Sequence, residues 1–414
     1  MPSRALLPSL LLLALARTAT SLSVAAPPPA PLNIATAQYL SDYPMALSLD
    51  GTPGYYYIRK STSAANASKW VVHIQGGGWC DSLDSCKSRS ESNLGSSAHN
   101  KTKEQDIQDL NSVHGCENNR WCGALMVNDP AINPVAHDWN AVLLRYTDGA
   151  SWIGDLAEPV THDGTKLYFR GRYNLEATFA DLQAKHGLGA ASEVLIGGDS
   201  AGGLATFLHI DKMSDMIHAA NAAKGAPRAD VLGMPDSGFW PDDQGFSQYV
   251  RAMFYMQTNG TADAAGLPKH CQARASNVTQ CLFPQYFADQ IKTRLWPLQS
   301  IYDPLQKGKD PQTHGQWLLD NLNRTVFSTV RKDGRANGGW VHSCERHCGA
   351  ELLTIDGTHA PAAVASFLAT SEGEVVDAGA DGDRDADTQR TQKKQTVWLQ
   401  QKSYPCTTCC NDQT

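Results

Sequence analysis

The sequence predicts an α/β protein in which a mainly parallel sheet is covered by helices on both faces. Short apolar runs bounded by turn residues alternate along the chain with longer segments of helical periodicity, as in a parallel sheet built from strand–helix–strand units. Residues 196–203, which read IGGDSAGG, set a serine among glycines between such a run and a helical pattern. With 42% hydrophobic residues, the 414-residue chain can bury a large core.

The N-terminus predicts export. Residues 1–25 begin with a positive charge at Arg4, ahead of an apolar stretch and small residues, which is typical of a secretory signal peptide too short to span a bilayer permanently. Residues 26–32 form a proline-rich leader, and residues 33–414 are expected to form a single domain. No later apolar run is long enough for stable membrane insertion. Eleven cysteines agree with an oxidising, extracellular compartment, as do the Asn-x-Ser/Thr sequons at Asn66, Asn100, Asn259, Asn277 and Asn323.

The remaining elements follow from the apolar pattern. Strands are expected at 70–74, 141–144, 194–196, 231–232 and 295–301, and helices at 173–185, 204–217, 316–330 and 361–368. Residues 371–390 are rich in Asp, Glu, Gly and Ala, too polar to pack, and predict a disordered acidic insertion. The net charge of −7 gives no electrostatic basis for binding nucleic acid, and we expect a monomer.

The serine motif has two interpretations. Gly-Asp-Ser is ordinary turn chemistry. Gly198 to Gly202 also fit G-x-S-x-G, the nucleophile elbow, in which a serine occupies a tight turn between strand and helix. The flanking strand-like and helix-like patterns favour the elbow and make Ser200 a candidate nucleophile.

A second glycine-rich stretch, Gln75-Gly76-Gly77-Gly78-Trp79, follows the first strand. It lacks the G-x-G-x-x-G spacing of a dinucleotide-binding loop. It fits the HGGG-type loop of esterases better, because bare glycines let main-chain amides face a developing oxyanion. On this interpretation Gly77, Gly78 and Ala201 donate the oxyanion hydrogen bonds.

The acid and base remain open from pattern alone. In an α/β-hydrolase both follow the nucleophile, in the order acid, then histidine. Asp236 and Asp303 both qualify as the acid, with Asp303 favoured by its position after a late strand, although either could simply cap a turn. Of the later histidines, His342 and His347 follow the last predicted core strand. A metal site built from Cys344, His347 and Cys348 with Cys406, Cys409 and Cys410 is the alternative; export favours disulfides there, and we expect no metal and no cofactor.

The chain resembles the pectin acetylesterase family, which includes the Wnt deacylase Notum. The resemblance spans about residues 33–410 and rests on the separate blocks DGTPGYY, HIQGGGWC, NPVAHDWNAVLLRYTDGASWIGD, IGGDSAGG, PDSGFW, CLFPQY, QSIYDPLQ, HSCERHC and YPCTTC. It implies a modified α/β-hydrolase fold and a secreted serine carboxylesterase that removes O-acyl groups, chiefly O-acetyl, from a polysaccharide such as pectin. Carried over block by block, it implies Ser200 as nucleophile, Asp303 as acid, His347 as base and Trp79 in the acyl pocket.

The chain departs from the family at one disulfide. Ser48 and Thr147 stand where relatives usually have a bridged cysteine pair. Cys116 and Cys122 are candidates for a compensating crosslink, and the pairs Cys80–Cys86 and Cys271–Cys281 are implied by the resemblance.

Two other functions stay open. One is a Notum-like deacylase of a lipidated protein, and the other is a non-catalytic binding protein on a hydrolase fold, because fold does not fix function.

Overall fold

The computed structural model describes residues 35–99, 124–243, 245–263, 265–329, 331, 333–349, 353–369, 396–406 and 409. The predicted signal peptide, leader and acidic insertion lie outside these ranges, as do Asn100, Cys116, Cys122 and Cys410. The described residues form one compact unit.

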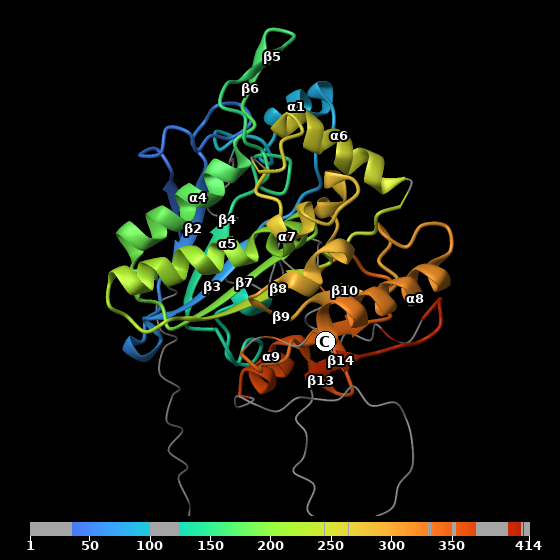
Figure 1. Cartoon of the computed structure of the whole chain (residues 1–414). Helices are drawn as coiled ribbons and strands as arrows, with labels where there is room; N and C mark the ends of the chain where they lie inside the picture. Colours follow the sequence, from blue (N-terminus) through green and yellow to red (C-terminus); the bar gives the residue numbers. More distant parts are fainter. Residues whose placement is uncertain are drawn as a thin grey trace, which may run out of the picture. The chain divides into compact units, whose positions relative to one another are not determined.

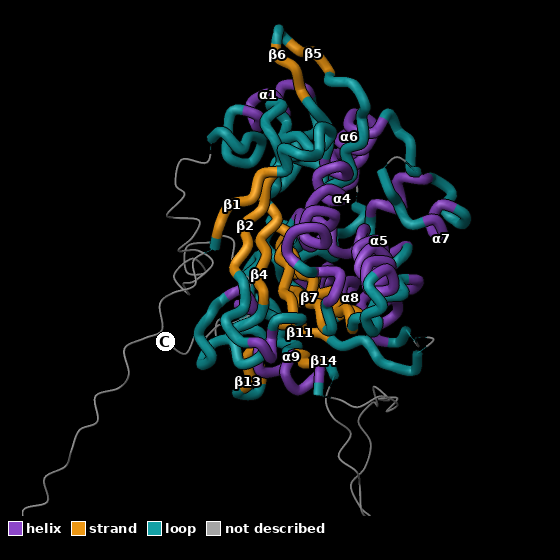
Figure 2. The backbone as a smooth tube through the Cα atoms, turned by 90° about the vertical axis from the view of Figure 1, so that its left-hand side faces the viewer, coloured by secondary structure: helices purple, strands orange, loops and turns teal. Residues whose placement is uncertain are grey.

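A ten-stranded sheet forms the centre of this unit (Figures 1 and 2). Its order is β1-β2-β4-β3-β7-β8-β10-β11-β14, with β9 paired to β8. The pairs from β4 to β14 are parallel, whereas β1 and β2 are antiparallel to their neighbours. The strands are β1 (Thr36–Tyr39), β2 (Tyr55–Arg59), β3 (Lys69–Ile74), β4 (Asn140–Leu144), β7 (Glu193–Asp199), β8 (Asp230–Asp236), β9 (Arg294–Leu295), β10 (Leu298–Ser300), β11 (Gly339–His342) and β14 (Val397–Leu399).

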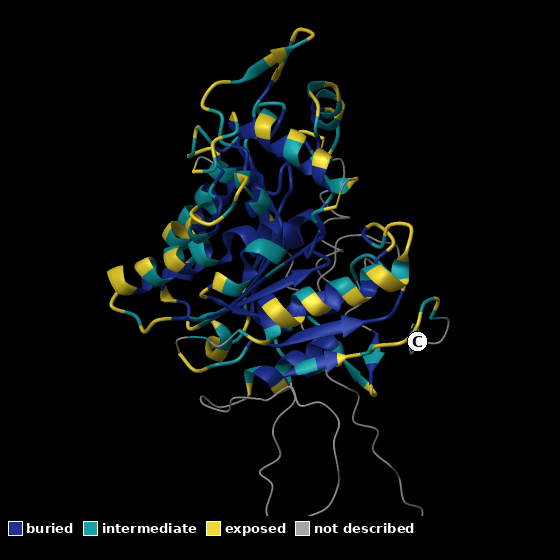
Figure 3. Cartoon of the chain, turned by 45° about the vertical axis from the view of Figure 1, so that its right-hand side comes forward, coloured by how far each residue is buried: buried dark blue, intermediate teal, exposed yellow. Residues whose placement is uncertain are grey.

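The continuous apolar runs produce strands that are buried on both faces, as Figure 3 shows. On β3, Val72 and Ile74 pack into the larger core cluster with residues of α4 and α5, while Val71 joins the opposite cluster with residues of α9. The helices are α1 (Leu83–Ser90), α4 (Gly171–Asp181), α5 (Ala201–Ala223), α6 (Phe246–Thr258), α7 (Lys269–Gln272), α8 (Pro311–Leu322) and α9 (Ala360–Leu368). The expected mainly parallel sheet with helices on both faces is confirmed.

Two small hairpins complete the described strands. β5 (Val160–His162) pairs with β6 (Thr165–Leu167), and β12 (Thr354–Ile355) pairs with β13 (Thr358–His359). The β5–β6 hairpin projects beyond the sheet beside α1, at the top of Figure 1.

Several element boundaries differ from those expected. The strand predicted at 295–301 is interrupted, because Pro297 between β9 and β10 has no amide to donate to a ladder. The helix predicted at 316–330 begins earlier, since the side chain of Asp310 caps the amide of Thr313 and Pro311 takes the first helical position. It ends at Leu322 and continues as a π-helical turn, Asn323–Phe327.

The disulfides Cys80–Cys86 and Cys271–Cys281 are present, which confirms both implied pairs. Cys406 is bonded to Cys409, Cys344 is also in a disulfide, and Cys348 carries a free thiol. Within the described ranges, no helix is both long and apolar enough to cross a membrane.

Candidate active site

The predicted site residues follow strands that end at one edge of the sheet. In the parallel register, Gly198 on β7 lies beside Ile74 at the end of β3, and Asp199 lies beside Asp236 at the end of β8. The glycine-rich stretch of residues 75–79, called the glycine loop below, follows β3 at this edge, and Ser200 follows β7. In open α/β sheets this carboxyl edge is where ligands bind.

Ser200 adopts a backbone conformation that few residues with a side chain occupy, with φ 54° and ψ −116°. Its amide donates to the carbonyl of Asp236 at 2.9 Å, and α5 begins at the next residue. The side chain stands on a tight turn between strand and helix, as the elbow interpretation expects. Ala201 is the first residue of α5, a position whose amide has no acceptor within the helix.

The glycine loop packs directly on the elbow. A Cβ atom built on Gly76 would lie 2.2 Å from the main-chain oxygen of Asp199 and 3.0 Å from Cβ of Ser200, so a side chain cannot fit there. The amide of Gly76 donates to Asp199 Oδ1 at 3.1 Å, and the same oxygen lies 2.9 Å from His73 Nε2. Asp199, the residue before the nucleophile, therefore ties the glycine loop to the elbow.

Two further side chains donate hydrogen bonds to carbonyl groups of the glycine loop. Arg89 Nη1 donates to the carbonyl of Gly77 at 2.9 Å, and the hydroxyl of Tyr146 donates to the carbonyl of Gly78 at 2.8 Å. Across the described part of the chain, no hydrogen bond uses the amide of Gly77 or Gly78. Fixed carbonyls with unused amides are the arrangement that an oxyanion hole needs.

Sequence reasoning did not find these supporting residues. His73 carried a weak signal, as the polar residue within the apolar run Trp70-Val71-Val72-His73-Ile74. Arg89 and Tyr146 carried none, because each reaches the loop from a separate segment of the chain.

His347 and Asp303 form a direct pair. His347 Nδ1 lies 2.6 Å from Asp303 Oδ2, and the carboxylate is fully buried. Burial lowers the pKa of His347, but the hydrogen bond and charge of Asp303, with the charges of Asp236 and Asp199, outweigh it and raise the pKa above the ordinary value of 6.5. Within the described residues, His347 Nε2 is buried without a hydrogen-bond partner, so it is not bonded to Ser200. Such bonds are often longer in unliganded enzymes.

Asp236 and His342, the alternative candidates for acid and base, have other hydrogen-bond partners. The carboxylate of Asp236 accepts from Ser237 Oγ and from the amide of Gly349. His342 belongs to β11, where its Nδ1 accepts from the amide of Cys344, and burial lowers its pKa to about 3. Three of the cysteines considered as metal ligands, Cys344, Cys406 and Cys409, are in disulfides.

Aromatic side chains gather beside His347. The ring of Trp240 lies 5.6 Å from the imidazole of His347 and stacks on Phe246 at 4.4 Å. Trp79 meets Trp240 edge-on at 5.1 Å, and its Nε1 donates to Ser151 Oγ at 2.7 Å. The hydroxyl of Tyr249 donates to the carbonyl of Trp79. These four rings, of Trp79, Trp240, Phe246 and Tyr249, form an aromatic cluster between the glycine loop and the histidine.

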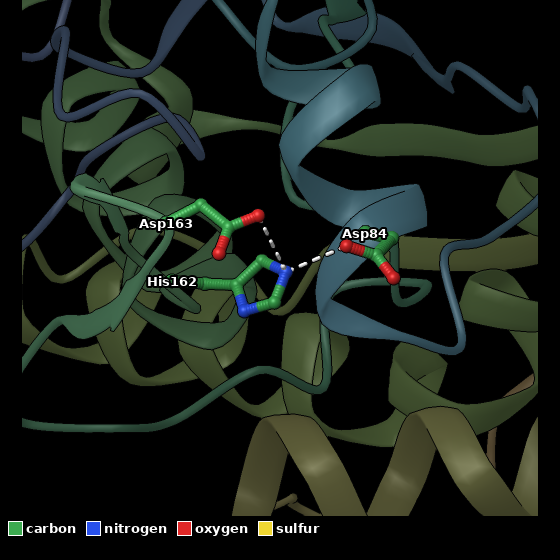
Figure 4. Close-up of side chains that lie close together, drawn as sticks. All are labelled: Asp84, His162 and Asp163. Carbon is green, nitrogen blue, oxygen red and sulfur yellow. Dashed lines mark hydrogen bonds and ion pairs between the residues drawn. The ribbon is translucent and has the colours of Figure 1, made fainter.

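One other group of side chains has the spacing of metal ligands. Asp84 on α1 and His162 and Asp163 of the β5–β6 hairpin lie together in Figure 4, with ligand atoms within 4.8 Å of one another. His162 Nε2 lies 2.6 Å from Asp84 Oδ1, and Lys87 Nζ lies 3.7 Å from Asp163 Oδ2. The carboxylate side chains are 85% and 67% exposed. Because the histidine and lysine already pair with these carboxylates, we interpret the group as an ion-pair network that ties the hairpin to α1.

Comparison with solved structures identifies the fold. The structure of the Wnt deacylase Notum from Drosophila superimposes with a TM-score of 0.64 at 22% sequence identity, covering 81% of this chain and 93% of that one. The chain therefore has the Notum type of α/β-hydrolase fold.

Sequence comparison then gives the family. The protein-family model described as Pectinacetylesterase matches residues 34–324. Pectin acetylesterase 5 of Arabidopsis thaliana is 32% identical over 73% of this chain and 70% of its own length. The palmitoleoyl-protein carboxylesterase NOTUM of Mus musculus is 26% identical over 72% of this chain and 57% of its own. The chain belongs to the pectin acetylesterase family and is a carboxylic ester hydrolase.

Proposed function

We propose that this protein is a secreted serine esterase that removes O-acetyl groups from a polysaccharide such as pectin, through a Ser200–His347–Asp303 triad. The single observation that carries the proposal is the 2.6 Å contact between His347 and Asp303. Asp236 is hydrogen-bonded both to Gly349, in the loop of His347, and to Ser200 in the strained elbow. Kinship to pectin acetylesterases supports the substrate class, and the disulfides support secretion.

The mechanism follows from the roles of these groups. His347 Nε2 takes the proton of Ser200 as the hydroxyl attacks the ester carbonyl, and Asp303 stabilises the resulting imidazolium. The amides of Gly77, Gly78 and Ala201 stabilise the oxyanion. His347 then protonates the departing sugar oxygen, leaving an acyl-enzyme. A water molecule, deprotonated by the same histidine, releases the acid and restores Ser200.

The aromatic cluster favours a short acyl group. Trp79 and Trp240 are 8% and 2% exposed and pack against each other and Phe246. The hydrogen bond from Trp79 to Ser151 opposes rotation of its ring. Moving these rings to admit a long acyl chain would break their packing contacts. We therefore propose that Trp79 bounds an acetyl-sized pocket.

A comparison of Ser200→Ala with Ser328→Ala tests the proposed nucleophile. Ser328 is exposed, follows the π-helical turn after α8, and is not one of the groups of the proposed mechanism. We expect a fluorophosphonate to label the wild type and Ser328→Ala, and hydrolysis of p-nitrophenyl acetate to fall roughly 10⁴–10⁶-fold in Ser200→Ala alone. Equal labelling of all three proteins, or labelling of none, would contradict the proposal and favour a non-catalytic binding protein.

Acyl chain length separates the two esterase alternatives. A long apolar pocket gains about 0.8 kcal/mol per buried methylene, whereas an acetyl-sized pocket gains nothing from added carbons. We expect kcat/KM for p-nitrophenyl acetate to exceed that for the octanoate, and acetylated pectin to release acetate. A preference for octanoate would instead favour deacylation of a lipidated protein, the activity named for the NOTUM relatives.

A further inference from the structure

Asp236, at the end of β8, contacts both halves of the proposed catalytic machinery. Its main-chain oxygen accepts the amide of Ser200 at 2.9 Å. Its Oδ2 accepts the amide of Gly349, two residues after His347, at 3.0 Å. One residue thus joins the turn that carries the nucleophile to the loop that carries the base.

Ser237 adds a second connection to the same loop. Its Oγ accepts the amide of Cys348 at 2.9 Å and donates to Asp236 Oδ1 at 3.0 Å. Ser237 and Cys348 both adopt positive φ angles, 51° and 58°, which are uncommon for residues with a side chain. Such a backbone conformation persists only when surrounding contacts enforce it, and these hydrogen bonds act on both residues directly.

We propose that Asp236 and Ser237 are positioning residues, which hold the loop of residues 347–349 so that the imidazole faces Ser200. This inference rests on the function proposed above and adds a role that the triad does not include. Asp303 orients the ring of His347 from its Nδ1 side, whereas Asp236 and Ser237 fix the backbone that carries the ring.

The charge of Asp236 gives this role a measurable signature. The titratable groups that interact with Asp236 are Asp199 from β7, and His347 and Cys348 from the loop of residues 347–349. Asp303, from the loop after β10, acts on His347 and Cys348. His73 pairs with Asp199, and His314 on α8 faces Asp303. Burial raises the pKa of Asp236 to about 6, and the hydrogen bonds from Gly349 and Ser237 oppose a further rise. Near neutral pH the carboxylate is therefore charged and helps to raise the pKa of His347.

The test compares Asp236→Asn with Ser237→Ala. The asparagine keeps the shape but loses the charge and one of two acceptor oxygens, while the alanine removes a hydrogen-bonding hydroxyl and leaves the charge. We expect kcat to fall about 10- to 100-fold in both variants, with little change in KM, because the base is displaced. The pH at which kcat/KM rises should move down in Asp236→Asn and move less in Ser237→Ala, where the carboxylate of Asp236 remains.

The rate of fluorophosphonate labelling of Ser200 as a function of pH provides a readout that needs no particular substrate. If neither variant labels more slowly than the wild type and the pH midpoint of Asp236→Asn is unmoved, the two residues are not positioning residues, whatever happens to the melting temperature. Should Asp236→Asn fail to fold, Ser237→Ala decides by its labelling rate. Absence of labelling in the wild type would instead contradict the proposed function itself.

Discussion

At the scale of single residues, His347 predicts how activity depends on pH. As the proposed general base, His347 acts in its neutral form, and Asp303, Asp236 and Asp199 favour the protonated form. We expect kcat/KM to rise with pH through a midpoint above 6.5, the ordinary histidine value. Rates measured between pH 5 and 9 on p-nitrophenyl acetate, corrected for its spontaneous hydrolysis, check this.

Asp303→Asn supplies the comparison for this prediction. It removes the hydrogen bond and the charge that contribute most to the raised pKa, so the midpoint should move to lower pH while kcat falls about 10³–10⁴-fold. A variant with an unchanged midpoint and near-normal kcat would show that Asp303 is not the acid and would return attention to Asp236.

At the scale of elements, Gly202 determines how closely α5 approaches β3. A Cβ atom on Gly202 would lie 2.0 Å from the carbonyl oxygen of Ile74, a main-chain atom that cannot rotate away. We expect Gly202→Ala to lower the free energy of unfolding by at least about 1–3 kcal/mol, since strand or helix must shift. Urea denaturation measures this loss.

Gly245→Ala is the matched control for the crowding at Gly202. Gly245 has φ −87°, and a Cβ atom there would meet nothing closer than 3.7 Å. The urea concentration at which half of the Gly245→Ala variant is unfolded should stay near that of the wild type. Equal stability of Gly202→Ala and Gly245→Ala would mean that the close approach of α5 to β3 is not required.

The elements that the sequence predicts well are those with a local cause. The pattern of residues 194–217 predicts a strand, a turn and a helix in one continuous stretch, and the structure has β7 and α5 there. The apolar pattern predicts neither the antiparallel pair β1 and β2 nor the late strands β11 and β14. Their pairing depends on partners far away in the chain, such as β4 for β2 and β11 for β14, and three to five residues carry too little periodicity to reveal it.

The same distinction applies to the candidate site. The positions of Ser200 and of the glycine loop follow from motifs. The sequence pattern alone does not decide between Asp236 and Asp303 as the acid, or between His342 and His347 as the base. The structure distinguishes these residues by contacts that span the chain, from Asp303 to His347 and from Asp236 to Gly349. Arg89 and Tyr146, which hold the carbonyls of the glycine loop, could be found only in three dimensions.

At the scale of the whole molecule, Ser48 and Thr147 mark a crosslink that this chain lacks. Both residues are buried, 0% and 2% exposed, and among the described residues neither hydroxyl has a hydrogen-bond partner. The amide of Leu49 donates to the carbonyl of Thr147 at 3.1 Å, so the two segments already lie side by side. Each buried hydroxyl without a partner costs stability, and a disulfide here would remove both hydroxyls.

We therefore expect the double variant Ser48→Cys with Thr147→Cys to form a disulfide and stabilise the protein by roughly 2–5 kcal/mol, because it closes a loop of about 100 residues in the unfolded chain. Mass spectrometry without reduction verifies the bond, and urea denaturation with and without reductant measures its contribution. Each single variant controls for the loss of a hydroxyl, since it makes the same local change without the bond. A double variant that stays reduced in oxidising buffer, or gains no stability over the single variants when oxidised, would show that the backbone has diverged from the geometry a bridge requires. Neither residue is one of the proposed catalytic groups, so hydrolysis of p-nitrophenyl acetate should be retained in the oxidised double variant if the bridge leaves Tyr146, the neighbour of Thr147, bonded to Gly78.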